Sequence, residues 1–135
     1  MRVFLDTNVL VSAFISRGLC ADLLQYVIAY EELVVGEVVL RELRRVLERL
    51  GAPEQKISLA EQLLRSCTVI EVPPHPHPMP LEDTDDRWVL ASAIEGNADV
   101  LVTGDAHLIG VASQVKIAIL SPRRFWESIL EGGQF

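Results

Sequence analysis

Short runs of β-branched and apolar residues alternate with longer amphipathic stretches, and this alternation constrains the fold more than any other feature of the chain. The runs predict five strands: residues 2–5, 33–35 and 69–72, then a run that begins directly after Asp99, and finally residues 116–120. Between them, apolar residues recur at helical spacing. Strands separated by helices favour a parallel sheet covered on both faces. We therefore expect one α/β domain over residues 1–135, a three-layer α/β/α sandwich around a central, mostly parallel five-stranded sheet of Rossmann-like type, with residues 132–135 frayed.

Prolines and capping residues predict where helices begin and end. Thr7 or Asn8 is expected to cap the first helix. Five prolines within residues 73–80 exclude helix and interior strand, so this segment is expected to be an extended surface connection. Thr84 or Asp85 can cap the helix that follows it.

The chain is acidic, with a net charge of −7 from 12 basic and 19 acidic side chains. This balance argues against a nucleic acid partner, because phosphate contacts need Lys and Arg. It does not exclude one, because bound cations would offset the charge of an acidic pocket.

No feature of the chain indicates export or a membrane. No stretch approaches the ~18 apolar residues that a membrane span needs, and nothing resembles a signal peptide. Cys20 and Cys67 have neither CxxC nor zinc-site spacing, which favours two reduced thiols. We expect a cytoplasmic protein without membrane contact.

Four acidic residues stand out because each falls where a strand ends or on the rim-facing part of a helix. Asp6 closes the first strand, and Asp105 closes the fourth. If these strands are neighbours where the strand order reverses, the two carboxylates face each other across the ligand-binding crevice of such sheets. Asp86 lies at the N-terminal end of the buried stripe of its helix. Glu42 lies roughly 85° from the centre of its helix's apolar stripe, on a flank that can reach the cleft.

Four like charges in one cleft repel each other unless a cation neutralises them. A hard divalent ion with oxygen ligands, Mg²⁺ or Mn²⁺, is the natural candidate. The sequence therefore predicts a metal site made by Asp6, Glu42, Asp86 and Asp105.

Alternatives stay open for two of these acids. Any acid at the start of a helix is favourable there, so the roles of Asp83 and Asp85 beside Asp86 are not decided. Glu42 alone is equally well explained by a surface ion pair with Arg45 or Arg49.

Four segments in a particular order and spacing resemble the PIN domain family of metal-dependent ribonucleases. They are Val3-Phe4-Leu5-Asp6-Thr7-Asn8, Arg41-Glu42-Leu43, Asp85-Asp86-Arg87-Trp88-Val89-Leu90-Ala91 and Ala98-Asp99-Val100-Leu101-Val102-Thr103-Gly104-Asp105. The resemblance covers nearly the whole chain. It is closest to the small prokaryotic PIN proteins that are toxins of toxin–antitoxin pairs.

This resemblance implies a PIN-like fold and a catalytic acidic quartet, with two polar residues beside it. The quartet is Asp6, Glu42, Asp86 and Asp105, and the polar residues are Asn8 and Thr103. It also implies a divalent-metal-dependent endoribonuclease with an RNA substrate, an antitoxin partner and a possible homodimer. Asp83 stands where the family often has a further acid. Gly36 departs from the Ser or Thr that many members have at the start of the third helix.

Competing interpretations use the same residues differently. A catalytically silent interaction module could keep the acidic pocket for a basic side chain of a regulator. Phosphotransfer folds are disfavoured, because a dehalogenase-like site needs a second Asp where Asn8 stands, and a receiver domain needs an Asp where the third strand ends in Glu71-Val72-Pro73.

Several other residues are weaker candidates. His75 and His77 have the spacing of a metal-binding pair but no further ligands nearby in the sequence. His107 is expected to be a helix-start surface residue or a substrate contact. Trp88 and Trp126 are expected to pack against the sheet. The arginines that could contact RNA, or simply balance surface acids, are Arg17, Arg41, Arg44, Arg45, Arg49, Arg87, Arg123 and Arg124.

Overall fold

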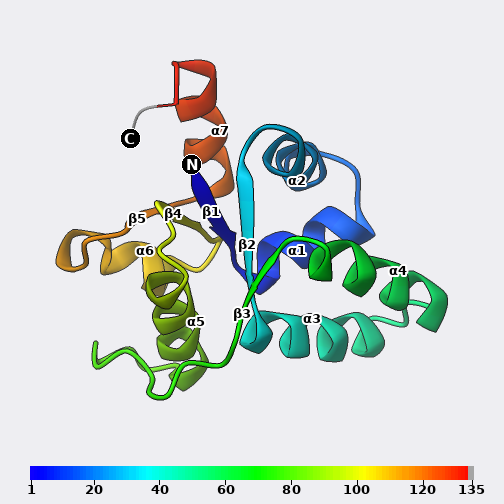
Figure 1. Ribbon diagram of the computed structural model, residues 1–135, viewed down its shortest axis with the longest axis horizontal. Helices are drawn as coiled ribbons and strands as arrows, with labels where there is room; N and C mark the ends of the chain where they lie inside the picture. Colours follow the sequence, from blue (N-terminus) through cyan, green and yellow to red (C-terminus); the bar gives the residue numbers. More distant parts are fainter. Residues whose placement is uncertain (134–135) are drawn as a thin grey trace.

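The computed structural model describes residues 1–133 and shows a five-stranded sheet with helices on both sides (Figure 1). The strands are β1 (Arg2–Leu5), β2 (Glu32–Gly36), β3 (Thr68–Ile70), β4 (Val100–Val102) and β5 (Ala118–Leu120). The helices are α1 (Thr7–Ile15), α2 (Leu19–Tyr30), α3 (Glu37–Arg49), α4 (Glu54–Arg65), α5 (Thr84–Glu95), α6 (Ala106–Gly110) and α7 (Pro122–Leu130), with a short 3-10 helix, η1, at Ala112–Gln114. All neighbouring strands are parallel, so the predicted α/β sandwich is confirmed.

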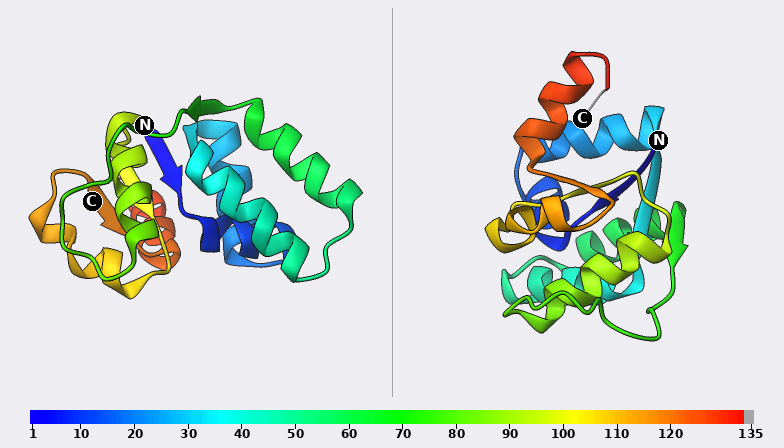
Figure 2. Two further views of the ribbon diagram at one scale, coloured as in Figure 1. Left: turned by 90° about the horizontal axis from the view of Figure 1, so that it is seen from below. Right: turned by 90° about the vertical axis from the view of Figure 1, so that its left-hand side faces the viewer.

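The strand order β3-β2-β1-β4-β5 determines where a ligand can bind. The chain moves from β1 outward to β3 and then returns to β4 on the other side of β1, so the order reverses between β1 and β4. Leu5 lies beside Val102 in the ladder, and the Asp6 amide donates to the Val102 carbonyl at 2.9 Å. Seen from below, α3 and α5 lie on opposite sides of β1 (Figure 2). The carboxyl ends of β1 and β4 therefore lie between these two helices, at the point of reversal where such sheets bind their ligands.

Close packing around β1 explains the glycine at the start of α3. Phe4 in the middle of β1 is fully buried. A Cβ atom on Gly36 would lie 3.1 Å from Cζ of the Phe4 ring and 3.2 Å from Cβ of Ser92. The phenyl ring thus occupies the space that a Ser or Thr side chain would need, and α3 begins without a side-chain cap.

Two predicted helix caps are wrong by one or two residues. Asp6, not Thr7 or Asn8, caps α1, because its side chain accepts from the Thr7 amide and Thr7 is already helical. Asp83, not Thr84 or Asp85, caps α5 by accepting from the Asp85 amide. In both cases the capping residue has the extended backbone that an N-cap requires.

Two predicted strands are longer than the observed ones because their partners are short. β3 pairs only with residues 34–36 of β2, so it ends at Ile70 and not at Val72. β5 pairs with the three residues of β4 and so begins at Ala118, not Lys116. The expected fraying of residues 132–135 falls partly on residues 134–135, which lie outside the described residues.

The proline segment, residues 73–80, contains neither helix nor strand, as predicted. Reciprocal bonds tie it to α5: the His77 amide donates to the Arg87 carbonyl at 3.0 Å, and Arg87 Nε donates to the His77 carbonyl at 2.8 Å. Arg87 is therefore occupied in holding this segment in place.

Within residues 1–133, no single helix combines the length and hydropathy of a membrane span. Helices α1 and α2 satisfy that test only as a pair with a 105° bend between them.

Substitution of Gly96 by Ala should destabilise the fold. Gly96 follows α5, and a Cβ atom there would lie 2.9 Å from Cγ1 of both Val34 and Ile70. These β-branched side chains cannot easily rotate away, so we expect the free energy of unfolding to fall by about 1–3 kcal/mol in urea denaturation. Gly110→Ala is the matched control, because nothing lies within 4 Å of the added atom. Equal stability of the two variants would contradict this packing argument.

Candidate metal centre

A cavity of about 380 Å³ opens at the carboxyl ends of β1 and β4. Its acidic lining residues are Asp6, Glu42, Asp83, Asp85, Asp86 and Asp105. Val11, Ile15 and Val46 form an apolar wall. The structure therefore brings the four predicted metal ligands together from four separate segments of the chain. Asn8 also lines this cavity, whereas Thr103 is buried directly behind it.

Asp6 is held rigidly by its neighbours and is only 5% exposed. Its Oδ1 accepts from the Thr7 amide at 2.7 Å, and its Oδ2 accepts from Thr103 Oγ1 at 2.7 Å and Asn8 Nδ2 at 3.1 Å. Burial raises the pKa of Asp6, the bonds from Thr103 and Thr7 oppose this, and the charge of Asp105 adds to the rise. The carboxylate is thus fixed in place while its charge is poorly compensated.

Asn8 and Thr103 join the start of α1 to the loop after β4. The Gly104 amide donates to Asn8 Oδ1 at 2.9 Å, and the Asp105 amide donates to Thr103 Oγ1 at 3.0 Å. A Cβ atom on Gly104 would lie 3.2 Å from Asn8 Oδ1, so the glycine permits this close approach. Together the two polar residues fix the position of Asp105 relative to Asp6.

Asp86 carries the clearest indication of a missing partner. It is 7% exposed, and its Oδ2 has no hydrogen-bond partner among the described residues. Burial, followed by the charges of Asp105, Asp83 and Asp6, raises the pKa of Asp86 to about 7. An orphaned buried carboxylate oxygen among other acids fits a divalent cation better than it fits an apolar or anionic ligand.

Glu42 faces the cavity from α3. Burial and the charges of Asp6 and Asp85 raise its pKa, while Arg45 and the Thr7 hydroxyl oppose this rise. Within residues 1–133, no salt bridge joins Glu42 to Arg45 or to Arg49, so the alternative of a surface ion pair is wrong.

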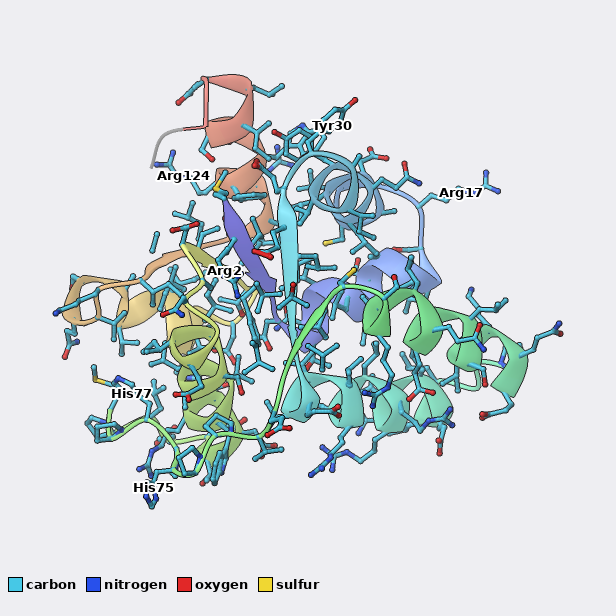
Figure 3. All side chains as sticks on the ribbon, viewed as in Figure 1. Arg2, Arg17, Tyr30, His75, His77 and Arg124 are labelled. Atoms are coloured by element: carbon cyan, nitrogen blue, oxygen red, sulfur yellow. The ribbon has the colours of Figure 1, made fainter. Side chains whose placement is uncertain are left out.

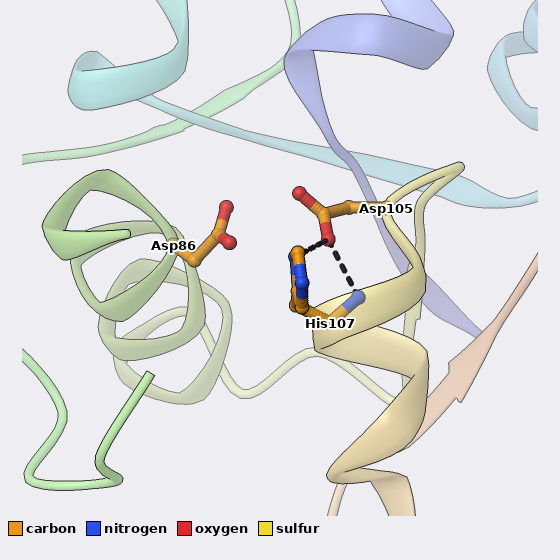
Figure 4. Close-up of side chains that lie close together, drawn as sticks. All are labelled: Asp86, Asp105 and His107. Atoms are coloured by element: carbon orange, nitrogen blue, oxygen red, sulfur yellow. Dashed lines mark hydrogen bonds and ion pairs between the residues drawn. The ribbon is translucent and has the colours of Figure 1, made fainter. Parts of the chain in front are cut away.

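His107 joins two of the acids in a group that could hold a metal ion. One ligand atom each from Asp86, Asp105 and His107 lie within 4.8 Å of one another (Figure 4). Asp105 Oδ1 accepts from the His107 amide at 2.7 Å, which caps α6, and lies 3.5 Å from His107 Nδ1. From the sequence, His107 is expected to be a helix-start surface residue or a substrate contact, not a metal ligand. Its spacing of two residues from Asp105, at a helix start, is the pattern that could have indicated it.

Asp83 and Asp85 take supporting positions at the edge of the cavity. Asp83 caps α5 through a 2.9 Å bond from the Asp85 amide, and its charge raises the pKa of Asp86. Asp85 also lines the cavity, and its charge raises the pKa of Glu42.

The His75–His77 pair is not part of any three-ligand group among the described residues. Both lie on the proline segment outside α5 (Figure 3). His77 Nδ1 accepts from the Met79 amide at 3.1 Å, which leaves this nitrogen unavailable to a metal.

Comparison with known proteins agrees with this fold and this acidic cavity. A family model described as a PIN domain matches residues 2–107, so the chain belongs to the PIN domain family. No curated protein sequence matches it.

Several solved structures share the fold. VapBC2 from Rickettsia felis bound to a promoter DNA fragment matches at a TM-score of 0.66 and 22% identity, covering 90% of this chain and 98% of that one. VapC20 from Mycobacterium tuberculosis, described as a sarcin-ricin loop cleaving toxin, matches at a TM-score of 0.62 and 14% identity. The match covers 81% of this chain and 94% of that one. VapBC-1 from nontypeable Haemophilus influenzae matches at a TM-score of 0.62 and 19% identity, and the match covers 91% of this chain and 99% of that one.

The raised pKa of Asp86 predicts an unusual pH dependence of stability in metal-free protein. A carboxyl group with a pKa near 7 in the folded state and near 3.8 when unfolded holds more protons when folded, so stability falls as pH rises between these values. At pH 8, Asp86→Asn should therefore have a free energy of unfolding about 1–3 kcal/mol higher than wild type, because the amide carries no charge to bury. At pH 4 the two proteins should be nearly equally stable. Thermal unfolding across this pH range measures the effect.

Glu95→Gln changes an exposed acid on the same helix and should keep the wild-type profile. If Asp86→Asn also keeps that profile, Asp86 is not the group that titrates.

Proposed function

We propose that this protein is a divalent-metal-dependent endoribonuclease and the toxin of a cytoplasmic toxin–antitoxin pair. The observation that carries the proposal is the convergence of Asp6, Glu42, Asp86 and Asp105 on one cavity, where Asp86 Oδ2 has no hydrogen-bond partner among the described residues. Membership of the PIN domain family supports nuclease chemistry. The description of the similar VapC20 as a loop-cleaving toxin supports RNA as the substrate, and the VapBC complexes support an antitoxin partner.

In phosphodiester hydrolysis, the residues of the cavity would have different roles. A bound divalent ion supplies a water molecule of lowered pKa and stabilises charge on the phosphate. Asp86 and Asp105 would hold the ion, because one carboxylate oxygen of each lies within 4.8 Å of the other. Asp6, fixed by Thr103 and Asn8, would orient the water around it. Glu42 would hold a water proton from the opposite wall, since its pKa is already raised.

A catalytically silent module is the alternative function. In that case a basic side chain of a regulator would take the place of the ion. A thermal shift with Mn²⁺, followed by an RNA cleavage assay, separates the two proposals: stabilisation with cleavage supports the enzyme, and partner binding without either supports the module. A homodimer stays a prediction in both cases.

Asp86→Asn should be the cleanest test of nuclease activity. Asp6 and Asp105 also cap helices, so their substitution changes the structure as well as the site. Asp86 has no such bond through Oδ2, and the amide has nearly the same shape. We expect divalent-dependent cleavage of RNA to fall by more than ~100-fold, because even the loss of an outer-sphere partner costs 10–100-fold. Undiminished cleavage by a pure, folded variant would end the assignment.

The metal-centre geometry also bears on which ion is preferred. Imidazole nitrogen suits transition metals, whereas Mg²⁺ is bound through oxygen. The His107 side chain is 72% exposed, so it is free to turn toward the Asp86 and Asp105 carboxylates beside it. We propose Mn²⁺ as the preferred ion and Mg²⁺ as a weaker substitute.

A ligand role for His107 is measurable without any activity assay. Electron spin echo spectroscopy of bound Mn²⁺ should show coupling to an imidazole nitrogen in wild type but not in His107→Ala. Calorimetry should show Mn²⁺ affinity lower by about 10-fold in this variant and Mg²⁺ affinity unchanged. His75→Ala, on the proline segment, is the control and should match wild type. Nitrogen coupling that survives in His107→Ala would refute the role.

A further inference from the structure

A second cavity, of about 270 Å³, lies beside the metal centre between α3 and α5. Glu42, Asp85 and Val89 line both cavities, so the two are adjacent. The second cavity differs from the first in chemistry, because Arg41, Arg45 and Trp88 line it and are absent from the metal centre.

Trp88 is not used in the core. The partly buried side chains packed against the core among the described residues include Trp126 but not Trp88. Trp126 also packs edge-on against Tyr26, with ring centroids 6.1 Å apart. The prediction that both tryptophans pack against the sheet is therefore confirmed for Trp126 and wrong for Trp88. A partly exposed tryptophan in a cavity, next to an acidic metal centre, is free to bind a flat ligand.

Arg41 and Arg45 are the cations of this cavity. They lie four residues apart on α3, so they project from the same face of the helix. Both are exposed, and within residues 1–133 neither forms a salt bridge, although Arg41 lowers the pKa of Glu37 and Arg45 that of Glu42 through charge. Arg44, between them, is instead held by Glu48, Glu54 and Glu61.

Three of the other candidate arginines, Arg17, Arg87 and Arg124, are less suitable. Arg87 holds the proline segment, and Arg124 pairs with Glu127 at 3.5 Å. Arg17 and Arg124 also lie at other edges of the molecule (Figure 3).

We propose that this second cavity is a subsite for one nucleotide of a single-stranded RNA, next to the phosphodiester held at the metal centre. An aromatic ring with arginines beside it is the usual means of binding single strands, since each base offers a flat face to stack on. The base of that nucleotide would stack on Trp88, and its phosphates would contact Arg41 and Arg45. A base in a duplex is already stacked and paired and cannot enter such a cavity. The inference rests on the proposed function and names its substrate class.

Intrinsic fluorescence isolates the stacking contact because the chain has two tryptophans. All proteins carry Asp86→Asn so that the RNA stays intact during the measurement. An oligouridylate should quench the fluorescence of Trp126→Phe, in which only Trp88 emits. It should leave Trp88→Phe, in which only Trp126 emits, unchanged. Unquenched Trp88 at saturating RNA would overturn the proposal.

Affinity measurements test the same subsite independently. Trp88→Leu should weaken oligouridylate binding about 10-fold in fluorescence anisotropy. Arg41→Gln and Arg45→Gln should each lower the slope of log binding constant against log salt concentration by about one, which corresponds to one phosphate contact. Lys56→Gln, which removes an exposed positive charge on α4 outside the cavity, is the control and should bind as before. Duplex RNA should not respond to Trp88→Leu. Equal sensitivity of duplex and single strand would refute the assignment of substrate class.

These outcomes are separable from failure of the proposed function. If Asp86→Asn leaves cleavage intact while Trp88 is still quenched, the assignment of the metal centre fails and the subsite stands. If cleavage is lost as expected but Trp88→Leu binds RNA normally, the nuclease stands and the subsite fails.

Discussion

The parallel pairing of β1 with β4 is the constraint on which the rest of the site depends. It places Asp6 and Asp105 after the ends of adjacent strands, and the hydrogen bonds of Asn8 and Thr103 then hold the start of α1 against the loop after β4. α3 and α5 approach from opposite sides of β1 and add Glu42 and Asp86. If β4 paired elsewhere in the sheet, the same four acids would be ordinary surface charges.

The fold stabilises an arrangement that its own electrostatics oppose. The pKa values of Asp6, Glu42 and Asp86 are all raised, and burial is the largest cause for each. Apolar packing of β1 and the helices around it must offset this repulsion in the metal-free protein. A cation reverses the sign of the interaction, because carboxylates that repel one another each attract the ion. Burial of mutually repelling carboxylates therefore lowers the stability of the metal-free protein, as is typical of functional sites with strongly shifted pKa values.

The second cavity gives the acidic centre a complement of opposite charge. Nucleic acid would be repelled by a cluster of carboxylates alone. Arg41 and Arg45 supply positive charge at its rim. Among residues 1–133 they form no salt bridge, whereas Arg44 is paired with three glutamates. The net charge of −7 thus conceals a local pattern that suits RNA better than the total suggests.

The sequence by itself determined the fold class and the parallel sheet, because apolar periodicity reflects the local preference for strand or helix. It also singled out the four acids that line the cavity, because their positions at strand ends and on helix faces can be read from the same periodicity. It also placed the break in regular structure at the prolines. What only the tertiary structure decided are relations between distant segments: that Asp6 rather than Thr7 caps α1, that β3 and β5 end with their partners, that His107 joins Asp86 and Asp105, and that Trp88 stays out of the core. Each of these depends on which side chain another element brings within reach, and periodicity along one segment carries no information about that.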